Sequence, residues 1–170
     1  MIMAGRRKLF GATRGTAGVE MALVAPLLMI LMFASIEMGN YFYDNHVVIK
    51  AVRDGARYAS RRGFIDFSCP STISNANGLV DATKNVTRTG QTIGGTARLS
   101  TWTNPNTVTV TLTCTDNSAS TYSGIYEGNG DVPVVRVSAI VPYRSMFSMI
   151  GFASTPVNIE AESEIPVMGI

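Results

Sequence analysis

Residues 17–43 read AGVEMALVAPLLMILMFASIEMGNYFY, and Glu20 and Glu37 are the only charged side chains in this stretch. The uncharged run Met21–Ile36 has 16 residues, which in a helix would span about 24 Å. A bilayer core is about 30 Å thick, so a spanning helix would continue into the aromatic residues that end the stretch, where an interface favours them. We therefore predict a transmembrane helix over residues 16–43.

Two other interpretations of the apolar run compete with a retained transmembrane helix. A cleaved secretory signal peptide has a shorter apolar core followed by a small-x-small site, and no convincing site of this kind precedes Glu37. A buried core helix rarely follows a basic tail, and this tail contains Arg6, Arg7, Lys8 and Arg14 without an acidic residue. The retained helix therefore explains more of the sequence than either alternative.

The composition of the rest of the chain indicates a soluble domain outside the cytoplasm. The chain has 170 residues and a net charge of +2, which does not favour a nucleic-acid binder. Basic residues flank the apolar run on both sides, so the positive-inside rule does not decide its orientation. From residue 64 onward there are 15 Thr, 12 Ser and 8 Asn, a polar, uncharged surface common in secreted bacterial domains. We expect a single-pass protein of the bacterial inner membrane with a cytoplasmic N-terminus and a periplasmic or extracellular domain over residues 63–170.

The helix is predicted to continue beyond the membrane over residues 44–62, as an amphipathic segment ended by Gly63. Asp54 lies four positions after Lys50 and three before Arg57, within reach of both. One face of the segment is apolar and another is basic: Val48, Ala51, Val52, Gly55, Ala56 and Ala59 form the first, and Lys50, Arg53, Arg57 and Arg61 the second.

Beyond Gly63 the sequence predicts a small antiparallel sheet domain, so the fold class is α+β with the long helix packed on the sheet. Strict alternation over Asn106–Thr115 indicates a half-buried strand. The other predicted elements are a loop at 64–76, a short helix at 79–89 ended by Gly90, strands at 96–103, 134–142 and 157–165, a hairpin loop at 115–131 and an apolar connector at 146–152.

The two cysteines, Cys69 and Cys114, are far apart in the sequence. A zinc site would need more ligands than these two residues and the lone His46. In an oxidising periplasm a structural disulfide is the best interpretation. It would close a loop of about 46 residues and contribute about 4 kcal/mol on the chain-entropy model. Inert free thiols and an intermolecular bond are the alternatives.

Catalytic and cofactor-binding motifs are missing from the sequence. It contains no Gly-rich phosphate loop, no G-x-S-x-G, no H-E-x-x-H and no plausible Ser/His/Asp set, so we expect neither an enzyme nor a cofactor, a metal or a small-molecule substrate.

Glu20 is the most informative residue, because a carboxylate at the start of a membrane helix is costly to bury and usually has a function. The alternative is an interfacial acid near a helix N-terminus, where negative charge is favoured. Glu20 is the fifth residue after Gly15, with a basic tail before that glycine. This layout resembles the cleavage site of type IV prepilins, which the peptidase cuts after glycine. The chain resembles more closely the TadE-like family, minor pseudopilins of the tight-adherence (Flp) pilus, through Gly18–Leu28, Glu37–Asn40 and Ala51–Ala59.

The resemblance covers about residues 15–60 and implies a pilin-like fold. It also implies that residues 1–15 are a leader peptide cut between Gly15 and Thr16, and that Glu20 recognises the amino group of a neighbouring helix. The implied partners are other pilins or pseudopilins, the pilus assembly machinery, prepilin peptidase and the lipid bilayer.

The function that follows is a minor pseudopilin that helps assemble or initiate a tight-adherence pilus, located in the inner membrane or incorporated in the pilus. The alternative is an unprocessed bitopic membrane anchor that displays an adhesive or protein-binding domain. A membrane-anchored envelope enzyme is a third hypothesis, and the missing catalytic motifs argue against it.

Overall fold

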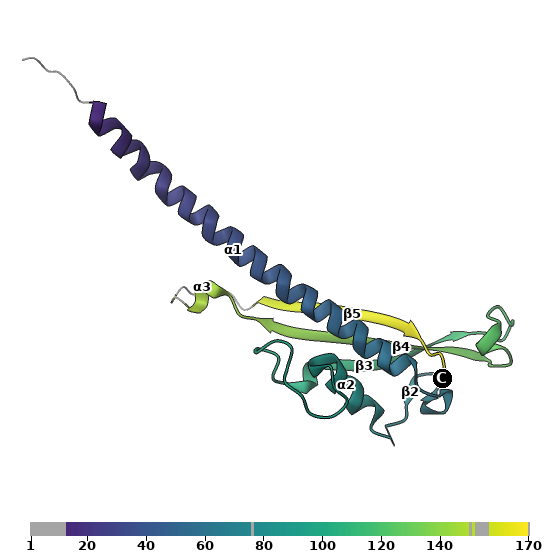
Figure 1. The fold of residues 1–170 in the computed structure, drawn as a ribbon. Coiled ribbons are helices and arrows are strands. Elements are labelled where there is room, and N and C mark those ends of the chain that lie inside the picture. Colours follow the sequence, from purple (N-terminus) through teal and green to yellow (C-terminus); the bar gives the residue numbers. More distant parts are fainter. Residues whose placement is uncertain (1–12, 76, 150, 152–156, 170) are drawn as a thin grey trace, which may run out of the picture. The chain divides into compact units, whose positions relative to one another are not determined.

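The computed structural model of the chain describes residues 13–75, 77–149, 151 and 157–169. It divides into two compact units, Met1–Gly39 and Asn40–Ile170. Helix α1, Thr13–Ser60, has 48 residues and passes from the first unit into the second (Figure 1). Pro26 lies inside α1 without ending it. The long helix and small antiparallel sheets confirm the predicted α+β class.

The main sheet of the second unit has three antiparallel strands in the order β3-β4-β5. They are β3 (Val108–Asp116), β4 (Asp131–Tyr143) and β5 (Val157–Pro166) (Figure 1). Val110 pairs with Val137, which in turn pairs with Ser163. The strands predicted near 106–115, 134–142 and 157–165 are therefore confirmed, as is the hairpin connection between the first two.

The hydrophobic core of the second unit lies between α1 and the sheet. Ala51, Ala56 and Ala59 of α1 are buried in one cluster with strand residues. Small side chains allow the helix backbone to approach the sheet closely. The strand residues of this cluster are Val108, Leu112, Val135, Val137, Ala139, Val141 and Ile159.

The strand predicted at residues 96–103 is wrong. The segment is a turn, in which the backbone N–H of Trp102 donates to the carbonyl oxygen of Leu99 at 2.9 Å. Both of these side chains are buried, and their three-residue spacing follows the turn rather than a strand. The hydrogen-bonded neighbour of β3 is β4.

The loop predicted at residues 64–76 contains regular structure. A 3-10 turn, η1 (Phe64–Asp66), leads into β1 (Phe67–Ser68), which pairs antiparallel with β2 (Thr72–Ile73). The apolar connector after β4 contains α3 (Met146–Met149), and residues 150 and 152 of that prediction lie outside the described residues. Two more 3-10 turns are η2 (Pro105–Thr107) and η3 (Gly124–Tyr126).

Helix α2, Leu79–Thr89, has the predicted boundaries. It ends because Gly90 adopts φ +81°, a left-handed conformation that favours glycine, and its N–H donates to the carbonyl oxygen of Val86 at 2.9 Å. Thr83 and Thr87 are fully buried, and the hydroxyl of Thr87 donates to the carbonyl oxygen of Thr83 at 2.8 Å. The interface of α2 with α1 is therefore formed partly by threonines.

Gly55 of α1 lies very close to α2. A Cβ atom at this position would lie 2.0 Å from Thr87 Oγ1 and 3.5 Å from the carbonyl oxygen of Thr83. The sequence predicted that the long helix packs on the sheet, and at Gly55 the neighbour is α2 instead.

The loop between β3 and β4 is organised by the buried side chain of Asn117. Its Nδ2 donates to the carbonyl oxygens of Tyr122, Tyr126 and Asn129 at 3.0, 3.1 and 3.2 Å. Its Oδ1 accepts from the N–H of Tyr122 at 2.7 Å. One amide side chain thus satisfies several backbone groups of an otherwise irregular loop.

The residues that follow β5 return to the core. Val167 is fully buried, and its N–H donates to the carbonyl oxygen of Pro133 at 2.9 Å. The N–H of Met168 donates to the carbonyl oxygen of Ser60, the last residue of α1, at 2.7 Å. The hydroxyl of Tyr126 donates to the carbonyl oxygen of Val167 at 2.8 Å. These bonds connect the final residues to β4, α1 and the Asn117 loop.

Candidate functional site

The candidate cleavage site lies at the start of α1. Since the helix begins at Thr13, the peptide bond between Gly15 and Thr16 lies in its first turn. N–H groups of a first turn have no partner within the helix. Glu20 is four residues beyond Thr16, and residues with this spacing lie on the same helix face, about 6 Å apart along the axis.

Glu20 is exposed on a helix segment whose apolar side chains are exposed as well. Leu23, for example, is 74% exposed. The segment lies within Ala17–Ser60, a helix long and apolar enough to cross a membrane, and its most apolar window has no residue buried within the protein. A lipid environment would cover such a surface. Glu37, at the other end of the apolar stretch, is half-buried.

The side chains of Lys50, Arg53, Arg57 and Arg61 are exposed. The sequence places Asp54 within reach of Lys50 and Arg57, but its ion-pair partner in the structure is another residue, Arg98. The Oδ2 atom of Asp54 accepts from Arg98 Nη2 at 2.9 Å, with both side chains about a quarter to a third exposed. This ion pair connects α1 to the segment after α2, 44 residues away in the sequence.

Arg62, two residues after the end of α1, packs on Tyr58 in the last turn of that helix. Its Nη2 donates to the Tyr58 hydroxyl at 2.9 Å, and its guanidinium carbon lies 5.2 Å from the ring centroid. Such a cation–π contact holds the arginine against the helix surface. The sequence analysis predicted neither the Arg62–Tyr58 contact nor the Asp54–Arg98 ion pair. The four-residue spacing of Tyr58 and Arg62 could have indicated the first of these contacts, because residues four apart on a helix are neighbours.

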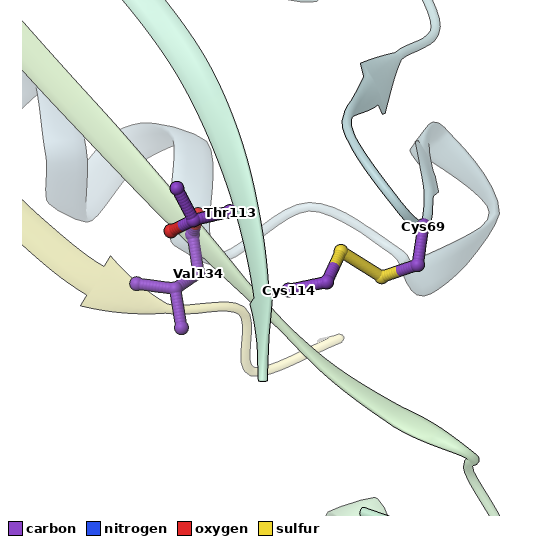
Figure 2. The surroundings of a disulfide bond; sticks show 4 residues. All are labelled: Cys69, Thr113, Cys114 and Val134. Carbon is purple, nitrogen blue, oxygen red and sulfur yellow. A yellow bond between two sulfur atoms is a disulfide. The ribbon is translucent and has the colours of Figure 1, made fainter. Parts of the chain in front are cut away.

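The structure brings the two cysteines together in a disulfide (Figure 2). Cys69 follows β1, Cys114 lies on β3, and their Cα atoms are 5.9 Å apart. Next to Cys114, the hydroxyl of Thr113 donates to the carbonyl oxygen of Val134 on β4 at 3.3 Å (Figure 2). The bond therefore connects the hairpin that follows α1 to the edge strand of the main sheet.

Two other side chains considered as candidates, His46 and Trp102, show no arrangement typical of a functional site. His46 is exposed, whereas Trp102 is fully buried and its Nε1 donates to Thr107 Oγ1 at 2.9 Å. Among the described residues, no group of three or more His, Cys, Asp or Glu side chains could hold a metal.

Gly15, Glu20 and the exposed apolar helix surface follow one another at the start of α1. Residues 15–57 match the model of the TadE-like protein family. The match confirms the resemblance over these residues, which cover α1 from its first turn almost to its end. Searches of curated proteins and of solved structures gave no match.

The TadE-like match and the apolar helix together indicate a membrane-anchored component associated with the tight-adherence pilus. TadE-like proteins are structural parts of this pilus system and are not known as enzymes. The TadE-like segment contains Gly15, Thr16 and Glu20, while both cysteines and the whole sheet lie outside it.

Proposed function

We propose that this protein is a minor pseudopilin that helps to assemble or initiate a tight-adherence pilus after prepilin peptidase cuts between Gly15 and Thr16. The observation that carries the proposal is the match of residues 15–57 to the TadE-like model, which starts at the glycine itself. The basic residues before Gly15 and the exposed apolar helix after it support the same proposal. Partners of this kind of subunit are pilins, other pseudopilins and the assembly machinery.

Glu20 has a physical role in this proposal. In a bilayer its carboxylate is surrounded by exposed apolar side chains of its own helix, and an unpaired charge there is penalised. The new amino group at Thr16 of a neighbouring subunit is the matching cation. In a low dielectric the two charges attract strongly while either alone is costly. The pair therefore fixes the axial register of one subunit against the next more than it adds net stability.

The first experiment determines the N-terminus of the protein extracted from membranes with active prepilin peptidase. We expect an intact mass and an N-terminal sequence that begin at Thr16. Gly15→Leu should block cleavage, because the bulky side chain would fill the peptidase subsite. Gly39→Leu is the matched control, since it adds the same bulk on α1 far from the cleaved bond, and it should be cut normally. A wild-type chain that still begins at Met1 would reject processing and leave the unprocessed membrane anchor.

The second experiment tests the role of Glu20 in assembly. Glu20→Gln keeps the size of the side chain but removes its charge, so pili should be lost while membrane insertion and cleavage persist. Glu20→Asp should retain part of the assembly, because the carboxylate is one methylene shorter. Glu37→Gln removes a charge at the other end of the apolar stretch and should leave pili intact. Normal pili with Glu20→Gln, at an unchanged membrane level of the protein, would refute the pairing role.

A further inference from the structure

The part of α1 in the second unit has a basic face opposite its buried face. Lys50, Arg53 and Arg57 of α1, together with Arg61 directly after its last residue, are exposed and form what we call the basic stripe. Successive helix residues are rotated by about 100°, so the three helical positions lie on the side opposite Ala51, Ala56 and the other buried residues of α1. The stripe therefore points away from the core of the unit.

A shallow cavity of about 390 Å³ lies along the basic stripe. The charge of Asp54, one of its lining residues, is already engaged by Arg98 at 2.9 Å. The arginines of the lining are consequently left with an excess of positive charge that a carboxylate could match. The cavity is lined by Asp54, Arg57, Tyr58, Arg61 and Arg62.

The outer face of β5 is acidic. Glu160, Glu162 and Glu164 are exposed and alternate with more buried residues, and we call them the acidic edge. β5 is an edge strand of the three-stranded sheet. Arg136 of β4 forms ion pairs with Glu162 and with Glu164, the latter at 3.5 Å. The carboxylates thus outnumber this arginine three to one.

The charged side chains are spaced at nearly the same distance along the basic stripe and along the acidic edge. Four helix residues advance about 6.0 Å, which separates Arg53 from Arg57. Two strand residues advance about 6.7 Å, which separates Glu160 from Glu162. We propose that the basic stripe of one copy of this protein docks against the acidic edge of a second copy, with the carboxylates entering the arginine-lined cavity.

The packing of the unit determines what kind of contact this would be. The buried side of α1 and the buried side of β5 belong to the same core, so the basic stripe and the acidic edge face outward on opposite sides of it. Within one copy they point away from each other. Two copies therefore associate head to tail, and each pair retains one free surface of each sign that can accept a further copy.

This contact uses only residues of the Asn40–Ile170 unit. It does not depend on cleavage after Gly15 or on Glu20. If the contact between copies were not found, the proposed pseudopilin function would still stand, and if the pseudopilin function were rejected, the contact could still form.

The experiment measures association between two differently tagged copies of the full-length protein in detergent micelles at low salt. Arg57→Glu or Glu160→Lys, each carried by both copies, should weaken association about fivefold, because attraction at one pair is replaced by repulsion. Raising the salt to about 1 M should weaken the wild-type contact as well, since screening then acts within about 3 Å. Arg144→Glu and Asp131→Lys reverse exposed charges elsewhere on the unit and are the matched controls.

The decisive arm mixes the two variants. A copy with Arg57→Glu retains its acidic edge, and a copy with Glu160→Lys retains its basic stripe, so one contact between them has both wild-type surfaces and association should recover. An intact Cys69–Cys114 disulfide in every variant verifies folding. Absence of wild-type association, or a mixture as weak as either variant alone, would overturn the proposal. Loss with Arg57→Glu but not with Glu160→Lys would also overturn it and would indicate that the stripe binds another anion, such as a lipid headgroup.

Discussion

Replacement of Gly55 by alanine should destabilise the second unit, although alanine is the better helix former. The new Cβ atom would lie 2.0 Å from Thr87 Oγ1, where contacts of 3.4 Å or more are ordinary. Relief of this overlap requires a shift of more than an ångström. Thr87 cannot easily move, because its side chain is fully buried and its hydroxyl donates to the carbonyl oxygen of Thr83 at 2.8 Å.

Two effects of opposite sign determine the size of this change. Overpacking in a well-filled core costs about 1–3 kcal/mol, while the exchange of glycine for alanine in a helix contributes up to about 1 kcal/mol in favour of folding. Because the overlap at Thr87 is severe, we expect a net loss of about 2 kcal/mol in the free energy of unfolding. For a unit of this size, that corresponds to a decrease in Tm of roughly 5–10 °C.

Trp102 is the only tryptophan of the chain and is fully buried in the second unit, so its fluorescence reports unfolding in urea. Gly39→Ala is the matched control, because no heavy atom lies within 4 Å of a Cβ at that position. In Gly55→Ala/Thr87→Ala the overlapping hydroxyl is gone, so the double variant should lose less stability than the two single variants added together. A Gly55→Ala protein as stable as wild type, or single effects that simply add, would refute the reasoning.

Two further predictions concern the Cys69–Cys114 bond and the Asn117 loop. Replacement of both cysteines by serine should lower the free energy of unfolding by about 4 kcal/mol in the Trp102 assay and leave membrane insertion unchanged; unaltered stability would show that the bond contributes nothing. Asn117→Asp retains an acceptor but cannot donate to three carbonyl oxygens, so it should cost about 2–3 kcal/mol and expose residues 117–130 to limited proteolysis. An equally resistant loop would contradict the role assigned to this side chain.

The elements with strong local signals could be predicted from the sequence. Both boundaries of helix α2 could be predicted, because an amphipathic pattern precedes Gly90. This glycine ends the helix by adopting a positive φ. Strand β3 was recognised from the alternation of Thr with Val, Leu and Cys. Its pairing with β4 followed from the polar, glycine-containing segment between them.

Features set by tertiary contacts could not be predicted in this way. Leu99 and Trp102 look like strand residues by composition, yet the chain turns between them. β1 and β2 have two residues each, too few for any periodicity. Asp54 had closer cations in sequence, but its partner Arg98 approaches from another segment. In the candidate site, the spacing of Gly15 and Glu20 can be read directly from the sequence. The placement of the charged faces of α1 and β5 on opposite sides of the core depends on tertiary packing and could be seen only in the folded unit.

The connection of the final residues to the core limits where a reporter can be attached. Val167 fills a fully buried position, and the N–H of Met168 is bonded to the end of α1. Gly169, at φ +66°, lies so close to Phe64 that a Cβ atom would be 2.3 Å from its ring. An epitope tag or fluorescent protein joined at or before this glycine would therefore disturb the contacts of the final residues with both β4 and α1. A reporter intended to follow the protein in living cells should be attached beyond Gly169 and include a flexible spacer.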